Sequence, residues 1–378
     1  MHLIAINTIV SVLLVLFSCK DAGESAADSD RVFQKPGAFS LKDYYTENAE
    51  LDKKVNDIIS NLSDGQKVAQ LIISSAGSNG KSTGEVNSLI ADGIIGGVIY
   101  LGGSKDEFTS MSSDFQTVAI SNFHPPLLIS TDGEPSLINR KISGIQEFPK
   151  TNTITTTEDA RIMASEIASL LNGMGITQNY APVCDYGYNK EIINSRSFGG
   201  NEMNIGTLAV EFIKATQDNG VVATAKHFPG HGNVSGDSHN KVVYINGELD
   251  ELSIFKEAID GGVISVMSGH IAIKNNSNYN TNGLPATLSS DILEGLLREE
   301  LGFKGLIITD GMNMGAVTKI NNASYKAFLA GCDLILMEPD ERGLHSDILN
   351  GMNDPAIKSR VDESVKRIIR AKVCLGLY

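Results

Sequence analysis

The sequence has no run of basic residues and no alternation of basic with aromatic residues, although it is 378 residues long. Its formal net charge is −14 at pH 7. A protein that binds nucleic acid usually carries a basic surface that neutralises phosphates. The composition therefore argues against a nucleic-acid partner and is typical of a solvated acidic surface.

Cysteine pairs of the kind that bind zinc or form a disulfide framework are also missing. The chain has four cysteines and no C-x-x-C pair, and Cys184, Cys332 and Cys374 are far apart in the sequence. Cys332 and Cys374 have apolar neighbours, which indicates small buried hydrophobic side chains. We therefore expect neither a metal knuckle nor a disulfide framework.

The apolar stretch at the N-terminus, Leu3 to Phe17, is too short for a comfortable transmembrane helix. It ends at Ser18-Cys19, and polar residues follow at once. This arrangement resembles a bacterial lipoprotein signal, so we expect a signal peptide over residues 1–18 and a membrane anchor through a lipid on Cys19. An ordinary cleaved signal or a short anchor is the alternative. Residues 19–45 are expected to be a flexible tether, and the protein is expected in the cell envelope, at the periplasmic face or the outer surface of the outer membrane.

A G-x-G-x-x-G motif is missing after the first apolar runs, which argues against a doubly wound sheet. Eight short apolar runs instead alternate with stretches of helical periodicity. This alternation predicts an α/β fold, a single-domain (β/α)8 barrel of the TIM type, over residues 46–378. The expected strands are Leu71–Ile73, Gly97–Leu101, Pro126–Ser130, Ile176–Tyr180, Val221–Ala225, Ile264–Met267, Gly305–Thr309 and Asp333–Met337.

Helix boundaries are indicated at two places. Apolar residues within 163–171 share one helical face, and Gly173 is placed to end that helix. Ser63 and Gln66 have the spacing of a capping box, which predicts that a helix begins after Ser63.

Charged residues follow the expected strands at their C-terminal ends, where barrel enzymes carry their chemistry. Each loses solvation near an apolar core, so their accumulation indicates a site rather than a contribution to stability. Asp310 directly follows a fully apolar strand; capping of the next helix is the alternative reading. The residues at the strand ends are Asp132, Glu134, Asp185, Lys226, His227, His270, Asp310 and Glu338.

The stretch from Ala225 to His239 contains three of the seven histidines. His227 and His231 are four residues apart, but the proline and glycines around them make a helix implausible, so we expect no metal. Asp237 and His239 lie in a polar loop, where the carboxylate can reach one ring nitrogen and fix the tautomer. An exposed histidine without a partner is the alternative.

Together these residues resemble glycoside hydrolase family 3, specifically its bacterial β-N-acetylglucosaminidase branch, from about Leu51 onward. The resemblance implies a (β/α)8 barrel, in a branch that often lacks the second domain of its β-glucosidase relatives. The motifs that carry it are Lys226-His-Phe-Pro-Gly-His-Gly, Asp237-Ser-His, Leu301-Gly-Phe-Lys-Gly-Leu-Ile-Ile-Thr-Asp-Gly-Met, Asn179-Tyr-Ala-Pro-Val-Cys-Asp, Arg196-Ser-Phe-Gly, Val266-Met-Ser-Gly-His and Pro285-Ala-Thr-Leu-Ser.

The resemblance also implies a role for each matching residue. Asp310 matches the nucleophile, and Asp237 with His239 matches the acid/base dyad of a retaining exo-β-N-acetylglucosaminidase. The expected substrates are peptidoglycan fragments or chito-oligosaccharides with a terminal GlcNAc; we expect a monomer and no cofactor. The residues expected to bind the sugar are Asp132, Arg140, Arg196, Lys226, His227 and Met312.

One departure from the family concerns the loop beside the sugar site, where Glu134-Pro135-Ser136 replaces the usual Glu-Gly-Gly. Proline fixes φ where glycine is permissive, so the fine substrate preference is open. A β-glucosidase or β-xylosidase of the same family, a GlcNAc phosphorylase, a metal-dependent barrel hydrolase and a non-catalytic sugar-binding lipoprotein are the alternatives. Gly230, Gly232 and Gly236 are expected to let the dyad loop approach Asp310.

Overall fold

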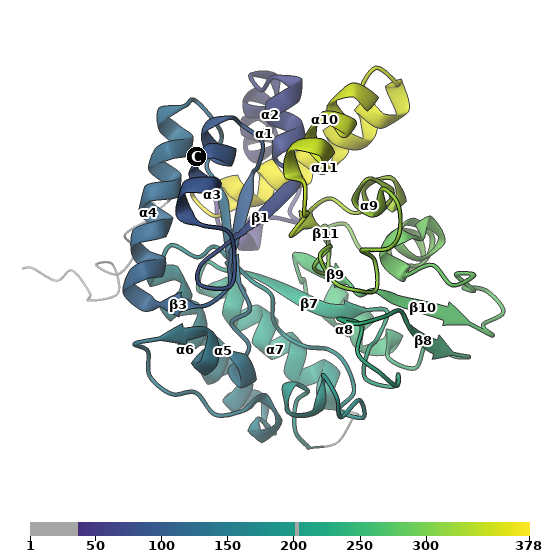
Figure 1. Cartoon of the computed structure of the whole chain (residues 1–378). Coiled ribbons are helices and arrows are strands. Elements are labelled where there is room, and N and C mark those ends of the chain that lie inside the picture. The colour runs from purple at the N-terminus through teal and green to yellow at the C-terminus, as the bar shows by residue number, and fades with distance from the viewer. Residues whose placement is uncertain (1–36, 201–203) are drawn as a thin grey trace, which may run out of the picture.

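The computed structural model describes residues 37–200 and 204–378 and shows an α/β barrel surrounded by helices (Figure 1). Eight parallel strands form one sheet in the order β11-β9-β7-β6-β4-β2-β1-β12. A bridge between Ile308 and Leu334 joins its two ends, so the barrel is nearly closed. The predicted fold class is confirmed.

Each predicted apolar run overlaps one strand of the barrel. The strands are buried on both sides, by the helices outside and by the side chains that fill the barrel inside, and a continuous apolar run is the sequence signature of that environment. The barrel strands are β1 Ile72–Ala76, β2 Gly97–Tyr100, β4 Leu128–Thr131, β6 Gln178–Asn179, β7 Val222–Phe228, β9 Ser265–Ser268, β11 Leu306–Thr309 and β12 Ile335–Leu336.

The helices cover the outside of the barrel (Figure 1), and their buried apolar side chains form one core cluster with those of the strands. They are α1 Ala49–Ser60, α2 Asp64–Ala69, α3 Thr83–Ala91, α4 Lys105–Ser121, α5 Pro135–Lys141, α6 Thr157–Gly173, α7 Ile205–Asp218, α8 Leu252–Asp260, α9 Ala323–Ala330, α10 Glu341–Gly351 and α11 Pro355–Cys374; Asp291–Glu300 form a π-helical segment, η6.

Both predicted helix boundaries are present. The capping box precedes α2: Gln66 N donates to Ser63 Oγ at 3.2 Å, and Ser63 N donates to Gln66 Oε1 at 3.0 Å. Helix α6 ends at Gly173, and the left-handed backbone that follows is supplied by Gly175, with φ +76°. The described cysteines, Cys184, Cys332 and Cys374, are free and buried.

Short elements extend the loops of the barrel. The strands β8 Val243–Asn246 and β10 Ile271–Lys274 form a small parallel sheet that extends away from the barrel (Figure 1). Val234, Val243 and Ile271 form a separate apolar cluster, which anchors the base of the loop after β7. The remaining elements are β3 Gly103–Ser104, β5 Ile142–Ser143 and the 3₁₀ helices η1 Leu41–Asp43, η2 Thr151–Thr153, η3 Asn194–Arg196 and η5 Ala286–Leu288.

The folded domain begins before the predicted boundary at residue 46. Leu41 and Tyr44 are buried, and Arg370 Nε of α11 donates to Tyr44 O at 2.5 Å. The tether expected over residues 19–45 is therefore wrong for its last residues, because their apolar side chains pack on α11. The expected signal peptide and lipidated Cys19 lie outside the described residues. None of the helices in residues 37–200 and 204–378 combines the length and apolar composition needed to cross a membrane.

A buried ion cluster fixes α11 to the N-terminal end of the barrel strands. Asp333, fully buried before β12, accepts hydrogen bonds from Arg298 Nη2 at 2.6 Å and Arg367 Nη1 at 3.0 Å. Ile307 N, in β11, donates to the same carboxylate at 2.9 Å. This cluster lies at the end of the strands opposite to the residues that the sequence predicts to be functional.

Candidate active site

A cavity of about 540 Å³ lies at the C-terminal ends of the barrel strands. Side chains that follow β4, β7 and β11 line it, together with the loop after β7 and the segment around Arg196. The structure thus brings together residues that are far apart in the sequence. The sequence-predicted residues that line this cavity are Asp132, Arg140, Arg196, Lys226, His227, Asp237, His239 and Asp310.

Asp310 directly follows β11 and reaches the cavity with a partly exposed carboxylate. Its backbone N donates to Ser268 O at 3.0 Å, and Gly311 N donates to Oδ1 at 2.8 Å. Burial alone would raise the pKa of Asp310, but the neighbouring His227 and His270, the Gly311 N–H and Lys226 hold that pKa below its usual value. The carboxylate is therefore ionised and available as a nucleophile.

The helix-capping interpretation of Asp310 is contradicted by the structure. The next helix, α9, begins at Ala323, and its N-cap is Asn322. The side chain of Asp310 is instead aligned by the short turn after β11. His270, fully buried, supports that turn, because its Nε2 lies 3.0 Å from Gly311 O and its Nδ1 lies 3.0 Å from Thr287 Oγ1.

Asp237 and His239 form a hydrogen-bonded dyad in the loop after β7. Asp237 Oδ1 lies 2.6 Å from His239 Nδ1 and accepts from His239 N at 2.8 Å. This hydrogen bond excludes the alternative of a histidine without a partner. The His239 side chain is 61% exposed, so its other ring nitrogen remains accessible. Burial acts to raise the pKa of Asp237, but the hydrogen bonds and charge of His239 outweigh it and keep that pKa low.

A network of ion pairs forms the floor of the cavity. Lys226 Nζ lies 2.8 Å from Asp132 Oδ1 and 2.5 Å from Glu134 Oε1. Arg196 forms a bidentate pair with Glu134, with both N–O distances 2.8 Å. Burial opposes ionisation of Glu134, but Arg196 and Lys226 lower its pKa to about 2. The network is therefore fully charged at neutral pH and presents both donors and acceptors to a polar ligand.

Lys141 is a site residue that the sequence analysis missed. Its Nζ lies 2.5 Å from Asp132 Oδ2, so two lysines hold the same carboxylate. Arg140, its neighbour at the end of α5, lines the cavity with an exposed side chain. The family resemblance pointed to Arg140, and only the packing of α5 decides which of two adjacent basic residues reaches Asp132.

His227 and His231 are engaged by protein partners. His227 Nδ1 lies 2.6 Å from Oδ2 of the fully buried Asp185, and His231 Nε2 lies 2.9 Å from Ser238 Oγ. His227 therefore keeps its Nδ1 proton toward Asp185 and presents Nε2 as an acceptor, 3.4 Å from Arg196 Nη2. Within the described residues no group of three or more His, Cys, Asp or Glu side chains is arranged to hold a metal ion.

The departure at Pro135 and Ser136 has a defined structure. Pro135 is the first residue of α5, a position where its fixed φ is favourable. Ser136 Oγ donates to the carbonyl oxygen of Ser195 at 2.6 Å, and Ser195 directly precedes Arg196 in the sequence. The Pro-Ser pair therefore links α5 to the segment that carries Arg196, a contact that a Gly-Gly pair lacks.

Two of the three glycines expected to give the dyad loop freedom have another function. A Cβ on Gly230 would lie 2.2 Å from Glu251 Oε2, and one on Gly232 would lie 2.1 Å from Tyr186 O. These glycines permit close packing around the buried Glu251, so the expectation of flexibility is wrong for them. Gly236 has φ +103°, and a Cβ there would meet only the side chains of Val243 at 3.4 Å and Lys241 at 3.7 Å, so it remains as a position of backbone freedom.

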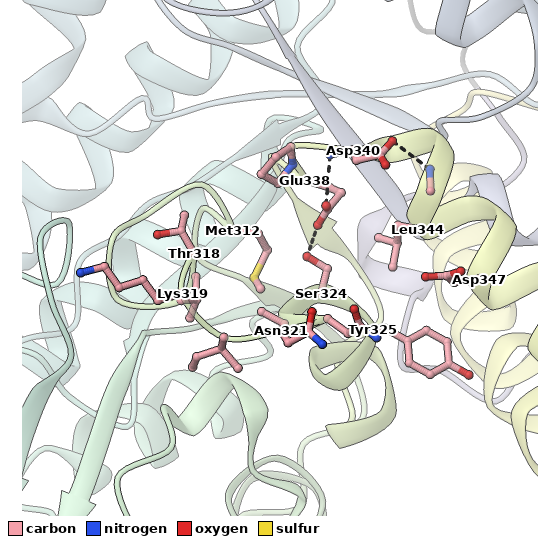
Figure 2. A pocket seen from close by; sticks show the side chains of 16 residues that line it. Met312, Thr318, Lys319, Asn321, Ser324, Tyr325, Glu338, Asp340, Leu344 and Asp347 are labelled. Carbon is pink, nitrogen blue, oxygen red and sulfur yellow. Dashed lines mark hydrogen bonds between the residues drawn. The ribbon is translucent and has the colours of Figure 1, made fainter.

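A second cavity, of about 690 Å³, lies between the turn after β11, the start of α9 and the start of α10 (Figure 2). Met312, expected to contact substrate, is buried and lines this cavity instead of the one with Asp310, because the turn after β11 directs it to the other side. Glu338 also lies here, hydrogen-bonded to Ser324 Oγ and, at 3.1 Å, to Asp340 N. The structure therefore separates both residues from the dyad.

Comparison with known proteins identifies the family of the chain. Residues 64–371 match the glycosyl hydrolase family 3 N-terminal domain. This match covers most of the chain, including β1 to β12 and every cavity residue named above. The chain therefore belongs to glycoside hydrolase family 3, as the sequence motifs indicate.

Individual relatives are moderately similar. A β-hexosaminidase of Methylobacillus flagellatus is 32% identical over 237 residues, which are 57% of this chain and 66% of that protein. A β-N-acetylglucosaminidase/β-glucosidase of Cellulomonas fimi is 30% identical over 275 residues, 67% of this chain and 48% of that protein. The solved family 3 β-N-acetylglucosaminidase of Paenibacillus sp. FPU-7 superposes with a TM-score of 0.76 at 32% identity, covering 84% of this chain and 63% of that one. The chain thus spans less than two thirds of each of these relatives.

Proposed function

We propose that the protein is a retaining exo-β-N-acetylglucosaminidase that removes terminal GlcNAc from peptidoglycan fragments or chito-oligosaccharides. One observation carries the proposal: the ionised Asp310 and the hydrogen-bonded Asp237–His239 pair line the same cavity. A nucleophile and a proton carrier on either side of one sugar are the minimum for a double displacement.

The proposed reaction is a double displacement in which Asp310 is the nucleophile and His239 carries the proton. In the first step an Asp310 oxygen bonds to the anomeric carbon while the bond from that carbon to the leaving oxygen breaks. The imidazolium of His239 gives its Nε2 proton to that oxygen and becomes neutral, with Nδ1–H still held by Asp237. In the second step neutral His239 takes a proton from water, the water oxygen bonds to the anomeric carbon, and Asp310 is released as carboxylate.

The floor of the cavity suits the hydroxyls of a pyranose. Lys226 and Arg196 can only donate hydrogen bonds, whereas ionised Asp132 can only accept them. Each of these charged groups already has a charged partner in the free protein, so hydroxyls that bind beside the ion pairs meet no unpaired buried charge. The site thus favours a polyhydroxylated ring over an apolar ligand.

The names of the relatives support GlcNAc as the sugar, and rates on different glycosides test this. Initial rates on nitrophenyl β-glycosides of GlcNAc, glucose and xylose should show preference for GlcNAc. Preference for glucose or xylose would instead identify a β-glucosidase or β-xylosidase. Adding phosphate distinguishes a phosphorylase, since GlcNAc 1-phosphate would replace GlcNAc as product; we expect free GlcNAc.

We also propose that a lipid on Cys19 anchors the protein in the bacterial envelope. The support is the apolar stretch that stops at this cysteine in the sequence. Fractionation of cells that express the full chain tests it. We expect the wild type in the membrane fraction and Cys19→Ser outside it; equal membrane content of both proteins would contradict the anchor.

A further inference from the structure

We propose that His231, Asn189 and Gly315 are positioning residues that hold the Asp237–His239 dyad over the cavity. The proposal deepens the proposed function and rests on it, because positioning has meaning only if the dyad transfers a proton. Hydrogen bonds tie the dyad to the rest of the protein on two sides, one at Gly236 and Ser238 and the other at the carbonyl of His239.

The first contact comes from His231, in the turn after β7. His231 is 1% exposed, and burial is the main reason that its pKa is lowered to about 4. The ring is therefore neutral at neutral pH. Its Nδ1 lies 3.3 Å from the side-chain nitrogen of Asn189, which can only donate. Nε2 therefore carries the ring proton and donates it to Ser238 Oγ at 2.9 Å. Ser238 is the residue between Asp237 and His239.

Asn189 fixes the orientation of that ring and ties it to the loop. Its side-chain Oδ1 accepts from Glu191 N at 3.1 Å, so the amide nitrogen faces His231. The same nitrogen donates to Gly236 O at 3.1 Å, directly before Asp237. Asn189 is 4% exposed, and its backbone N also donates to Gly232 O at 2.7 Å. One buried amide thus joins the His231 turn to the start of the dyad.

The second contact comes from the segment that follows Asp310. Gly315 N donates to His239 O at 2.8 Å. A Cβ at position 315 would lie 2.7 Å from Asn240 O and 2.8 Å from His239 O, so a side chain there must displace backbone. The segment that carries the nucleophile therefore directly contacts the loop that carries the proton donor, and Gly315 is the residue that permits the contact.

These contacts predict a particular defect when they are removed. Displacing the dyad leaves Asp310 and the sugar-binding floor in place, so bond cleavage suffers only where the leaving group needs a proton. A dinitrophenolate leaves without one, whereas the more basic methylumbelliferyl phenolate, and still more an alcohol such as that of GlcNAc, needs the proton. Loss of fold or of sugar binding would instead lower both rates by the same factor.

The test measures kcat/KM on two GlcNAc glycosides, the dinitrophenyl and the methylumbelliferyl, for His231→Ala, Asn189→Ala and Gly315→Ala. We expect a fall of about 10- to 100-fold on the methylumbelliferyl glycoside, since a misplacement of about 1 Å costs about that much. On the dinitrophenyl glycoside we expect less than about a threefold fall in kcat/KM. Azide, which needs no general base, should raise kcat of the variants on the dinitrophenyl glycoside.

Conservative and matched variants separate positioning from stability. His231→Gln keeps a donor near the position of Nε2 and should recover most of the rate on the methylumbelliferyl glycoside. His345→Ala, a buried histidine that contacts Gly65 O far from the cavity, and Gly84→Ala, where no atom lies within 4 Å of a Cβ, should leave both rates unchanged. Equal losses on both glycosides in His231→Ala, or none, would overturn the inference.

The same assay distinguishes failure of the inference from failure of the proposed function. If His239→Ala shows the leaving-group dependence and His231→Ala does not, the dyad acts as proposed and the positioning is wrong. If wild type cleaves neither glycoside, or His239→Ala lowers both rates equally, the proposed function itself is wrong.

Discussion

Asp185 and His227 share a hydrogen bond of 2.6 Å beneath the floor of the active-site cavity. The same carboxylate accepts from His227 N at 3.1 Å and from His231 N at 2.8 Å, and it is fully buried. Burial would raise the pKa of Asp185, but the two histidines outweigh it and keep that pKa low. One carboxylate therefore fixes both the histidine that lines the cavity and the turn that leads to the dyad.

Asp185→Asn should test this relationship. The amide can donate to His227 Nδ1 and shift the ring proton to Nε2, so His227 would meet the sugar as a donor instead of an acceptor. We expect kcat/KM on a GlcNAc glycoside to fall by about 10- to 100-fold with equal losses for good and poor leaving groups. Asp106→Asn, at an exposed position of α4, is the matched control. An unchanged kcat/KM would show that the tautomer of His227 does not matter.

Lys141 provides a second prediction. Because it pairs with Asp132 together with Lys226, Lys141→Ala leaves the carboxylate with one cation and removes a donor from the cavity. We expect KM to rise about tenfold with little change in kcat, as for an interaction present equally in the ground and transition states. Lys150→Ala, an exposed lysine outside the cavity, should change neither constant. A fall in kcat alone would place Lys141 in the chemical step instead.

Ser136 tests the departure from the family pattern. Ser136→Gly and Ser136→Ala both remove the hydrogen bonds of Ser136 Oγ with Ser195 O at 2.6 Å and with Thr151 N at 2.8 Å, and only the glycine variant also frees the first turn of α5. Both variants should loosen Arg196 and raise KM a few-fold; the glycine variant should in addition lose about 1 kcal/mol of unfolding free energy. Urea unfolding and Michaelis–Menten kinetics measure the two effects. A Ser136→Ala enzyme with unchanged KM would remove Ser136 from the sugar site.

The Asp333 cluster predicts the response of the fold to acid. Burial opposes ionisation, but Arg298, Arg367 and Arg360 lower the pKa of Asp333 from 3.8 to about 2. A carboxyl group whose pKa is lower in the folded than in the unfolded protein stabilises the fold. This contribution is complete at pH values above the pKa of the unfolded state, and it is lost as the pH falls through about 2. Asp333→Asn should therefore lose about 3–5 kcal/mol of unfolding free energy at pH 7, because three arginines lose their charged partner.

The same variant gives a pH signature in urea unfolding. The difference in unfolding free energy between wild type and Asp333→Asn should be constant above about pH 4 and shrink between about pH 4 and pH 2. A difference that stays constant through this range would mean that another carboxylate governs acid unfolding.

The sequence was sufficient for the barrel because its strands are buried on both sides and read as continuous apolar runs. It was sufficient for Asp310 because a strand end fixes where the next side chain points. It could not choose between Arg140 and Lys141, since adjacent residues of a helix differ in direction by about 100° and only packing of α5 decides which one reaches Asp132. Nor could it reveal Asn189 or Gly315, whose contacts exist only once distant loops meet.

For Met312, Gly230 and Gly232 the sequence led to an expectation that the structure contradicts. Motif similarity placed Met312 at the sugar, but the turn after β11 directs its side chain into the second cavity. Gly230 and Gly232 read as flexible in a loop sequence, yet each is required by the close approach of Glu251 or Tyr186. A glycine needed for backbone flexibility and a glycine needed because a side chain would clash look the same in the sequence. Only the surrounding atoms distinguish them.

The most direct test of the account is the initial rate of Asp310→Ala on the nitrophenyl β-glycoside of GlcNAc, measured beside the wild type and with unfolding curves for both. We expect a loss of at least about 10⁴-fold with an unchanged fold, because Asp310 forms the covalent bond in the proposed mechanism, whereas the cavity carboxylates of Asp132 and Asp237 are held by Lys226 and His239. Hydrolysis by Asp310→Ala at the wild-type rate would contradict the central claim.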